Sequence, residues 1–194
     1  MKSLRVLVAD DDEAVRAALV QLSQALNHEV VGEARDGHEA VALARTTNPD
    51  VVLLDIRMPH MDGLKAAKAI TDEKLLPIII VTAHADQTLM EEAAEVGVFS
   101  YLLKPITLQR LAAAISTARA RFADLQVLRA EVGDLKSALE ARKLVERAKG
   151  ILMRDLRVGE QEAYRWLKRT SSHHNKKLAE VARRIVALEQ HPAH

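Results

Sequence analysis

Five residues with polar side chains lie at the ends of short apolar runs in the first half of the chain. Asp10 and Asp11 follow "LRVLVA", Asp55 ends "VVLLD", Thr82 lies in "IIIVTA" and Lys104 lies in "FSYLLKP". Carboxylates that lie close together repel one another unless a cation neutralises them, and an all-oxygen site suits Mg²⁺. A carboxylate beside such a cation can attack a phosphoryl group, whose oxygens a hydroxyl and an ammonium then bind. These residue types therefore predict phosphoryl transfer to an aspartate, provided that the fold brings them together.

The pattern of the first 120 residues predicts a fold that does so. Apolar runs alternate with segments of helical period, which is typical of an α/β fold with a five-stranded parallel sheet covered on both faces. In such sheets ligands bind beyond the carboxyl ends of the strands, where the five polar residues are expected. The predicted strands are residues 4–9, 29–34, 51–55, 78–83 and 99–105, and one predicted helix between them is "TLMEEAAEV", residues 88–96.

Each of these polar residues also has a simpler interpretation. The aspartates of "DDD", residues 10–12, could cap the helix that follows them. Asp55 and Lys104 could form an ordinary surface ion pair. Suitable residue types at four strand ends are nevertheless much less expected by chance than any one of them alone, so the phosphoryl-transfer site is favoured.

The motifs "VLVADDD", "VVLLDIRMPHMDG", "VTA" and "YLLKP" resemble, in order and spacing, those of the receiver domain of two-component response regulators. This resemblance covers residues 1–120 and implies a flavodoxin-like, doubly wound fold and a sensor histidine kinase as partner. It implies that Asp55 is the phosphoacceptor, and that Pro105 follows a cis peptide bond. It further implies a Mg²⁺ site made by Asp10, Asp11, Asp55 and the backbone carbonyl of Arg57, and a phosphoryl-binding and switch set made by Thr82, Tyr101 and Lys104. Tyr101 could instead be an ordinary half-buried strand residue.

A long helical segment connects this part of the chain to the next. Between Pro105 and Gly133 there is no glycine or proline, and apolar residues recur at coiled-coil spacing with one phase shift. We predict a coiled-coil linker over 121–135 that forms a homodimer on phosphorylation; the alternative is a helix that packs on its own domains. The predicted seam is Leu111, Ile115, Ala118, Phe122, Leu125, Leu128, Val132, Leu135 and Leu139.

The remaining residues, 136–194, predict a three-helix bundle with a basic exterior. They contain 14 Lys and Arg against 7 Asp and Glu, and apolar residues recur at helical period in three segments. The first helix is expected to end at Leu156, the second to cover "EQEAYRWLKRT" and the third to follow Asn175. In the third helix the predicted buried stripe is Leu178, Val181, Ala182, Ile185 and Leu188.

No catalytic constellation is visible in the bundle. His173 and His174 are adjacent in a predicted loop, which does not fit a metal pair at helical spacing. Asn175 is expected to cap the third helix, although it could also read a base. Trp166 is expected in the core, with base stacking by Trp166 and Tyr164 as the alternative. The protein is therefore expected to be a signalling protein and not an enzyme, with a receiver that assists the transfer of a phosphoryl group to its own aspartate.

The segments "ALEARKLVERAKGILM", "EAYRWLKR" and "NKKLAEVARRIV" resemble the three helices of the ANTAR output domain of transcription antitermination regulators. A receiver, a coiled coil and this bundle form that family's common architecture. The resemblance implies binding to paired stem-loops in nascent RNA that overlap a transcription terminator. The candidate RNA contacts are Arg147, Lys149, Asn175, Lys176 and Lys177.

The charge distribution agrees with two modules of different function. Residues 1–120 contain 12 Lys and Arg against 17 Asp and Glu, whereas residues 121–194 contain 16 against 10. The chain has no cysteine and no apolar run of membrane-spanning length, so we expect a cytoplasmic protein without a membrane partner. The alternatives for the basic module are DNA binding through a helix in the major groove, or docking on a protein.

Overall fold

The computed structural model describes residues 3–83 and 96–190, and within them five strands form one parallel sheet, as predicted. The strand order is β2-β1-β3-β4-β5, so the chain winds outward from β1 in both directions. The predicted helix over residues 88–96 falls almost wholly outside the described residues. The strands are β1 (Arg5–Ala9), β2 (Glu29–Ala34), β3 (Val51–Asp55), β4 (Ile78–Thr82) and β5 (Ser100–Leu103).

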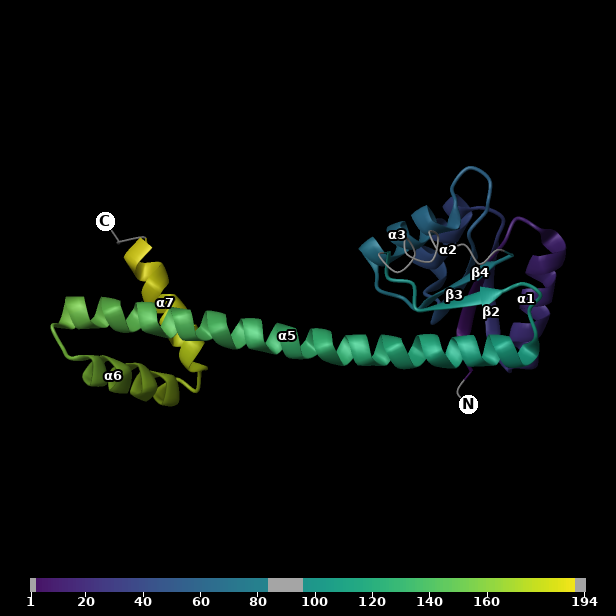
Figure 1. Ribbon diagram of the computed structural model, residues 1–194. Coiled ribbons are helices and arrows are strands. Elements are labelled where there is room, and N and C mark those ends of the chain that lie inside the picture. The colour runs from purple at the N-terminus through teal and green to yellow at the C-terminus, as the bar shows by residue number, and fades with distance from the viewer. Residues whose placement is uncertain (1–2, 84–95, 191–194) are drawn as a thin grey trace. The chain divides into compact units, whose positions relative to one another are not determined.

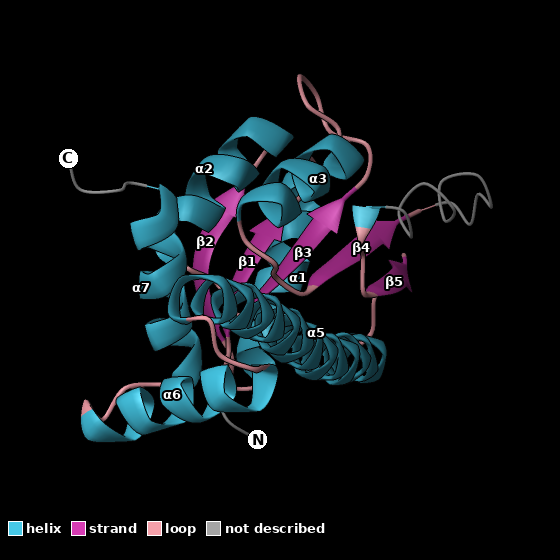
Figure 2. Cartoon of the chain, turned by 90° about the vertical axis from the view of Figure 1, so that its left-hand side faces the viewer, coloured by secondary structure: helices cyan, strands magenta, loops and turns pink. Residues whose placement is uncertain are grey.

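Helices cover both faces of this sheet because its central strands are apolar on both sides (Figure 2). In β4, for example, Ile78 and Ile80 pack toward α2 (Gly37–Thr47) and α3 (Gly63–Glu73). Ile79 and Val81 alternate with them and pack toward α1 (Glu13–Ala25) and α5 (Leu108–Leu156). Successive side chains of a strand point to opposite faces, so one apolar run serves two cores.

Aspartates fix where the first three helices begin. The carboxylate of Asp12 accepts hydrogen bonds from the backbone N–H groups of Ala14 and Val15, at 2.8 and 3.3 Å, and so caps α1. Asp36 and Asp62 cap α2 and α3 in the same way. These side chains satisfy N–H groups that have no partner inside the helix. The capping interpretation of "DDD" therefore holds for Asp12, which leaves Asp10 and Asp11 for other roles.

The helix α5 is continuous over 49 residues and runs through the predicted linker (Figure 1). Leu111, Ile115 and Ala118 at its start are buried against the sheet, so for this half of the predicted seam the alternative of packing on its own domain holds. The later seam residues are exposed in the described structure: Leu128, Val132, Leu135 and Leu139.

The chain divides into two compact units, residues 1–126 and 127–194. In the second unit the last part of α5 packs with α6 (Glu160–His173) and α7 (Leu178–Gln190) around one small core, which confirms the three-helix bundle. The core consists of Ala148, Ile151, Leu152, Ala163, Leu167, Val181, Ala182 and Val186. Within residues 3–83 and 96–190, no helix combines the length and the apolar character needed to cross a membrane.

Three predictions about side-chain burial and helix length in this unit are wrong. Trp166 is not in the core but 42% exposed, because a narrow stripe of Ala163 and Leu167 is enough to fill the space that the other two helices leave. Leu188 is 71% exposed, and Val186 takes its place in the buried stripe. His173 is the last residue of α6 and not part of a loop, since the helix continues one turn beyond the predicted end.

The loop before β2 contains a buried histidine that is expected to make stability depend on pH. His28 is 6% exposed, and its Nδ1 has no hydrogen-bond partner among the described residues. Burial lowers the pKa of His28 below its ordinary value of 6.5, and the positive charge of Arg119 on α5 acts in the same direction. The folded chain therefore favours the neutral imidazole, whereas the unfolded chain takes up a proton once the pH falls below 6.5.

The stabilisation from neutral His28 is complete above the ordinary pKa and is lost as the pH falls through the pKa of the folded protein. The loss for one group is at most about 1.4 kcal/mol per pH unit. Calorimetric melting at several pH values between about 7.5 and 5 should show a smaller acid-induced fall for His28→Leu than for the wild type. Equal falls in the two proteins would contradict this prediction.

Candidate functional site

Four neighbouring strands bring the predicted site residues to one edge of the sheet. Asp10 directly follows β1, Asp55 is the last residue of β3 and Thr82 is the last residue of β4. Lys104 directly follows β5, and its backbone N–H donates to the carbonyl of Thr82 at 2.9 Å. Because all these strands are parallel, their carboxyl ends meet, and the predicted convergence is observed.

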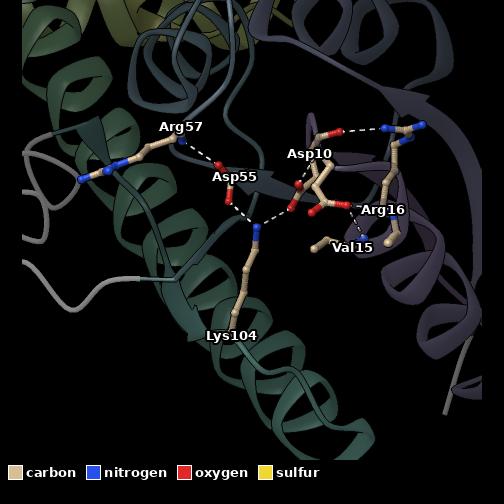
Figure 3. Close-up of polar contacts among 8 residues, drawn as sticks. Asp10, Val15, Arg16, Asp55, Arg57 and Lys104 are labelled. Atoms are coloured by element: carbon tan, nitrogen blue, oxygen red, sulfur yellow. Dashed lines mark hydrogen bonds and ion pairs between the residues drawn. The ribbon is translucent and has the colours of Figure 1, made fainter.

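At this edge the Lys104 ammonium joins two carboxylates (Figure 3). Its Nζ lies 2.8 Å from Asp10 Oδ2 and 2.7 Å from Asp55 Oδ1. The peptide bond between Lys104 and Pro105 is cis, as the family resemblance implies. Asp55 is 5% exposed, so the contact is not the plain surface ion pair of the simpler interpretation.

Asp10 is a charged group in an unfavourable place. The residue is completely buried, and burial raises the pKa of its carboxyl; the contact with Lys104 opposes this shift, while the charge of Asp55 adds to it. For Lys104, burial alone would lower the pKa, but close contact with the charged carboxylates of Asp10 and Asp55 outweighs it and raises the pKa. One ammonium thus serves two carboxylates, and the site retains an excess of negative charge.

This excess fits a hard cation such as Mg²⁺. Although Lys104 lies 2.8 Å from Asp10 Oδ2, the contact lacks hydrogen-bond geometry, and this oxygen has no hydrogen-bond donor among the described residues. Mg²⁺ needs only one or two protein carboxylates because it usually keeps several waters. Asp11 is exposed, and in the described part of the chain no three His, Cys, Asp or Glu side chains are grouped as a metal site.

The imbalance predicts that Asp10→Asn stabilises the fold in the absence of metal. The amide keeps the shape of the carboxyl but removes one of two buried negative charges, and Lys104 keeps Asp55 as its partner. We expect a gain of about 1 kcal/mol in the free energy of unfolding without metal. Calorimetry in EDTA and in Mg²⁺ checks this: the variant should melt higher in EDTA and should lose the stabilisation that Mg²⁺ gives the wild type.

As a matched control, Asp72→Asn removes one exposed carboxylate from α3 and should change neither result. An Asp10→Asn protein that melts lower than the wild type in EDTA would show that the ion pair with Lys104 outweighs the burial of the charge.

The loop after β3 holds the second oxygen of Asp55. The backbone N–H of Arg57 donates to Asp55 Oδ2 at 2.6 Å, while the Arg57 side chain is exposed. The same loop places the Arg57 backbone beside the carboxylates, but its carbonyl as a metal ligand stays a prediction. Thr82 is buried at the end of β4. Tyr101 is half-buried on β5 against the core that α2 and α3 share with the sheet, and its rotation on activation also stays a prediction.

Two residues at this site were missed by the sequence analysis. Arg16 of α1 is buried, and its Nη1 donates to the backbone carbonyl of Asp10 at 2.9 Å (Figure 3). Its Nε lies 3.4 Å from Glu33. Gly63 begins α3 so close to β3 that a Cβ at this position would lie 1.9 Å from the carbonyl oxygen of Asp55. The signals available were an arginine on the apolar side of a helix and the glycine of "MDG", but neither reveals its contact without the fold.

Three of the five candidate RNA contacts form ion pairs within the bundle. Lys149 is 8% exposed, and its ammonium lies 2.8 Å from Glu146 and 2.6 Å from Glu160 of α6. Arg147 and Lys176 are each paired with a glutamate of α7, Glu189 at 3.4 Å and Glu180 at 2.6 Å. Lys177 is exposed, and no ion pair joins it to another described residue.

Asn175 does not cap α7. It has a positive φ of 50°, and its N–H donates to the carbonyl of Ser172, while the N–H of Lys176 donates to that of Ser171. These two bonds form a Schellman motif, in which a residue of left-handed conformation ends a helix. Asn175 therefore ends α6 instead of starting α7, because asparagine tolerates this conformation. Its side chain is exposed.

Comparisons with known proteins match both parts of the chain. A family model of the response regulator receiver domain matches residues 6–116, and a model of the ANTAR domain matches residues 133–186. The transcriptional regulatory protein PdtaR of Mycobacterium tuberculosis is 39% identical over 178 residues, which cover 92% of this chain and 87% of that protein.

Two further proteins are similar to only part of this chain. The signal receiver domain of NarL from Mycobacterium tuberculosis superposes with a TM-score of 0.57 at 35% identity, over 61% of this chain and 98% of that domain. Protein-glutamate methylesterase/protein-glutamine glutaminase 3 of Syntrophomonas wolfei is 38% identical over 105 residues, 53% of this chain and 30% of that enzyme. Because the match covers only 30% of the enzyme, it gives no reason to assign that activity to this chain. The two matched domains indicate a signalling regulator.

Proposed function

This chain belongs to the response regulators that join a receiver domain to an ANTAR domain, and we propose that phosphorylation of Asp55 controls RNA binding and transcription antitermination by the ANTAR domain. The observation that carries the proposal is the contact of Asp10, Asp55 and Lys104 at one edge of the sheet. This contact lies in the same chain as a basic three-helix bundle, so we propose that one chain both receives the phosphoryl group and binds the RNA.

The geometry supports phosphoryl transfer from a sensor histidine kinase. A carboxylate oxygen of Asp55 forms a bond to phosphorus while the bond between phosphorus and the imidazole nitrogen of phosphohistidine breaks, and the imidazole keeps the electron pair. Lys104, already 2.7 Å from Asp55, holds the negative charge of the phosphoryl oxygens. The N–H of Arg57 orients the carboxylate, and Thr82 is proposed to contact a phosphoryl oxygen.

We propose that Mg²⁺ binds at the carboxylates of Asp10 and Asp55, with Asp11 and the carbonyl of Arg57 completing the site. When bound, the ion neutralises the charge of the incoming phosphoryl group. Without it, Asp10 and Asp55 compete for one ammonium and would repel a third anion. Arg16 supports the site by fixing the backbone of Asp10, on which the direction of its side chain depends.

We propose domain boundaries of 1–120 for the receiver, 121–135 for the linker and 136–194 for the ANTAR domain, in a protein that acts in the cytoplasm. The exposed residues Leu128, Val132, Leu135 and Leu139 of α5 support a homodimer through the linker, because each would bury apolar surface against the same helix of a second copy. Phosphorylation adds close to two negative charges at the receiver site and so favours one conformation of the elements around it.

A gel-shift experiment tests the output. The purified chain is mixed with a pool of hairpin RNAs or with duplex DNA of matching length, with and without an acyl-phosphate donor and Mg²⁺. RNA retention that changes with phosphorylation supports the proposal. Preference for duplex DNA, or no binding to either nucleic acid, would overturn the RNA-binding function and leave a DNA-binding or protein-docking bundle.

The double variant Lys176→Ala, Lys177→Ala should weaken RNA binding. Both cations precede α7, but a phosphate at Lys176 competes with Glu180, so loss of one to two phosphate contacts should lower the slope of log affinity against log salt by about 0.7 to 1.5. Titrations of labelled hairpin RNA at several salt concentrations measure the slope. Lys65→Ala with Lys68→Ala removes the same charge from α3 and is the control, because it should leave affinity and slope unchanged. An unchanged slope in the first variant would remove Lys176 and Lys177 from the contact surface.

A further inference from the structure

Most of the basic residues among the candidate RNA contacts form ion pairs that hold the bundle together. Arg147 is paired with Glu189, Lys149 with Glu146 and Glu160, and Lys176 with Glu180. Arg154 is also paired with Glu189, at 3.0 Å. A phosphate that binds one of these cations must compete with a carboxylate already in place, so these residues offer little free positive charge.

The outer face of α6 has the opposite character. Arg165, Lys168 and Arg169 are exposed, and no ion pair joins them to any residue that the structure describes. At about 100° per residue they lie on the side of the helix opposite Ala163 and Leu167, which are completely buried. The nearest carboxylate on this face is Glu162, in the first turn, and it too forms no ion pair with a described residue. The face therefore keeps a net positive charge.

Two aromatic side chains border these three cations. Trp166 is 42% exposed and Tyr164 is 43% exposed, and helical geometry puts them on opposite edges of the basic strip. Tyr164 lies one turn from Lys168, and Trp166 lies one turn from Arg169. A nucleotide outside a base pair presents a flat base next to a phosphate. Exposed aromatic rings can stack on the base, and neighbouring cations without ion pairs can bind the phosphate.

We propose that unpaired bases of the RNA loop stack on Trp166 and Tyr164, while Arg165, Lys168 and Arg169 contact the neighbouring phosphates. This inference rests on the proposed RNA-binding function and adds a contact surface that the basic residues of the other two helices do not provide. A perfectly paired duplex exposes no base face to these rings, so this surface selects RNA whose loop bases are accessible.

Trp166 makes the proposal directly measurable, because it is the only tryptophan of the chain. Fluorescence excited selectively in tryptophan therefore reports on this one position in the full-length protein. The probe is the tightest-binding member of a pool of labelled hairpin RNAs with randomised loops; anisotropy of its label reports binding, and tryptophan quenching reports stacking. A hairpin with the same stem and an abasic loop keeps the phosphates but removes the bases.

We expect the intact hairpin to quench Trp166 and the abasic hairpin to bind more weakly without quenching. Trp166→Ala should weaken binding of the intact hairpin roughly 5- to 100-fold, and Trp166→Phe should restore most of it. Leu188→Ala, which truncates a more exposed apolar side chain on α7, is the control and should change nothing. Calorimetry of each variant shows whether the bundle is still folded.

The outcomes separate this inference from the function on which it rests. If no hairpin of the pool changes the anisotropy of its label, RNA binding itself fails. If hairpins bind but do not quench Trp166, and Trp166→Ala binds as tightly as the wild type, only the stacking surface is overturned. A Trp166→Ala protein that changes its oligomeric mass and keeps its RNA affinity would likewise overturn it and assign the ring to a protein contact.

Discussion

Asp55→Asn is expected to abolish phosphorylation of the protein while leaving its fold intact. Asparagine has the shape of aspartate, and its amide oxygen can still accept the hydrogen bond from Lys104, so the edge of the sheet keeps its geometry. The neutral amide, however, is not a nucleophile toward phosphorus. Incubation with an acyl-phosphate donor and Mg²⁺, followed by intact-mass measurement, should show one added phosphoryl group on the wild type and none on the variant.

A second substitution separates loss of the acceptor from a general change of charge. The control is Asp50→Asn. Asp50 lies just before β3, at the end of this strand opposite to Asp55, and its carboxylate accepts a hydrogen bond from the backbone N–H of Arg5. This variant should be phosphorylated like the wild type. Label retained on the peptide that contains residue 55 of Asp55→Asn would sink the assignment of the phosphoacceptor.

Gly63→Ala is expected to have the largest effect on stability. Its Cβ would lie 1.9 Å from the carbonyl oxygen and 2.9 Å from the carbonyl carbon of Asp55, and backbone atoms cannot move aside as a flexible side chain can. Either α3 or the end of β3 must shift, and the hydrogen bond of 2.8 Å from the Gly63 N–H to the carbonyl of Ile56 is then strained as well. We expect a loss of about 2–4 kcal/mol in the free energy of unfolding of the receiver unit.

The same substitution at Gly150 is the matched control. Gly150 lies inside α5, and a Cβ there would meet nothing within 4 Å. Because alanine is a better helix former than glycine, Gly150→Ala should be neutral or should stabilise by up to about 1 kcal/mol. Scanning calorimetry of both variants, with phosphorylation measured beside it, checks the pair. A Gly63→Ala protein that melts and accepts phosphate like the wild type would contradict the close approach.

Much of the receiver fold could be predicted from the sequence, because its strands and helices follow from periodic patterns of apolar residues within short segments. Continuous apolar runs indicate strands that are buried on both faces, and the helical segments between them indicate a parallel sheet. The carboxyl ends of such strands must meet, so the positions of Asp55, Thr82 and Lys104 at strand ends were enough to predict their convergence. Helical periodicity likewise correctly predicted where α5 ends, at Leu156.

The sequence could not divide roles among similar neighbours. Residues 10–12 are all aspartate, yet the fold buries Asp10 beside Lys104, exposes Asp11 and uses Asp12 as a helix cap. Which aspartate does what depends on the exact turn of the chain between β1 and α1. Lys104, far along the chain, contacts the Asp10 carboxylate at this turn, and Arg16 of α1 holds the Asp10 carbonyl. Identical residue types carry no such information.

The small bundle shows the same limit more strongly. A helical period indicates that one side of α6 is apolar, but the small core of the bundle needs only a narrow stripe of it, so Ala163 and Leu167 are buried while Trp166 remains exposed. Lys149 looked like a free cation in the sequence and is instead held by two glutamates, one of them from another helix. The sequence by itself determined the two folds and predicted the phosphoacceptor chemistry, because these follow from periodicity and residue type. Only the tertiary structure decided which charges and rings remain available to a partner, because pairing and burial are contacts between residues far apart in the chain.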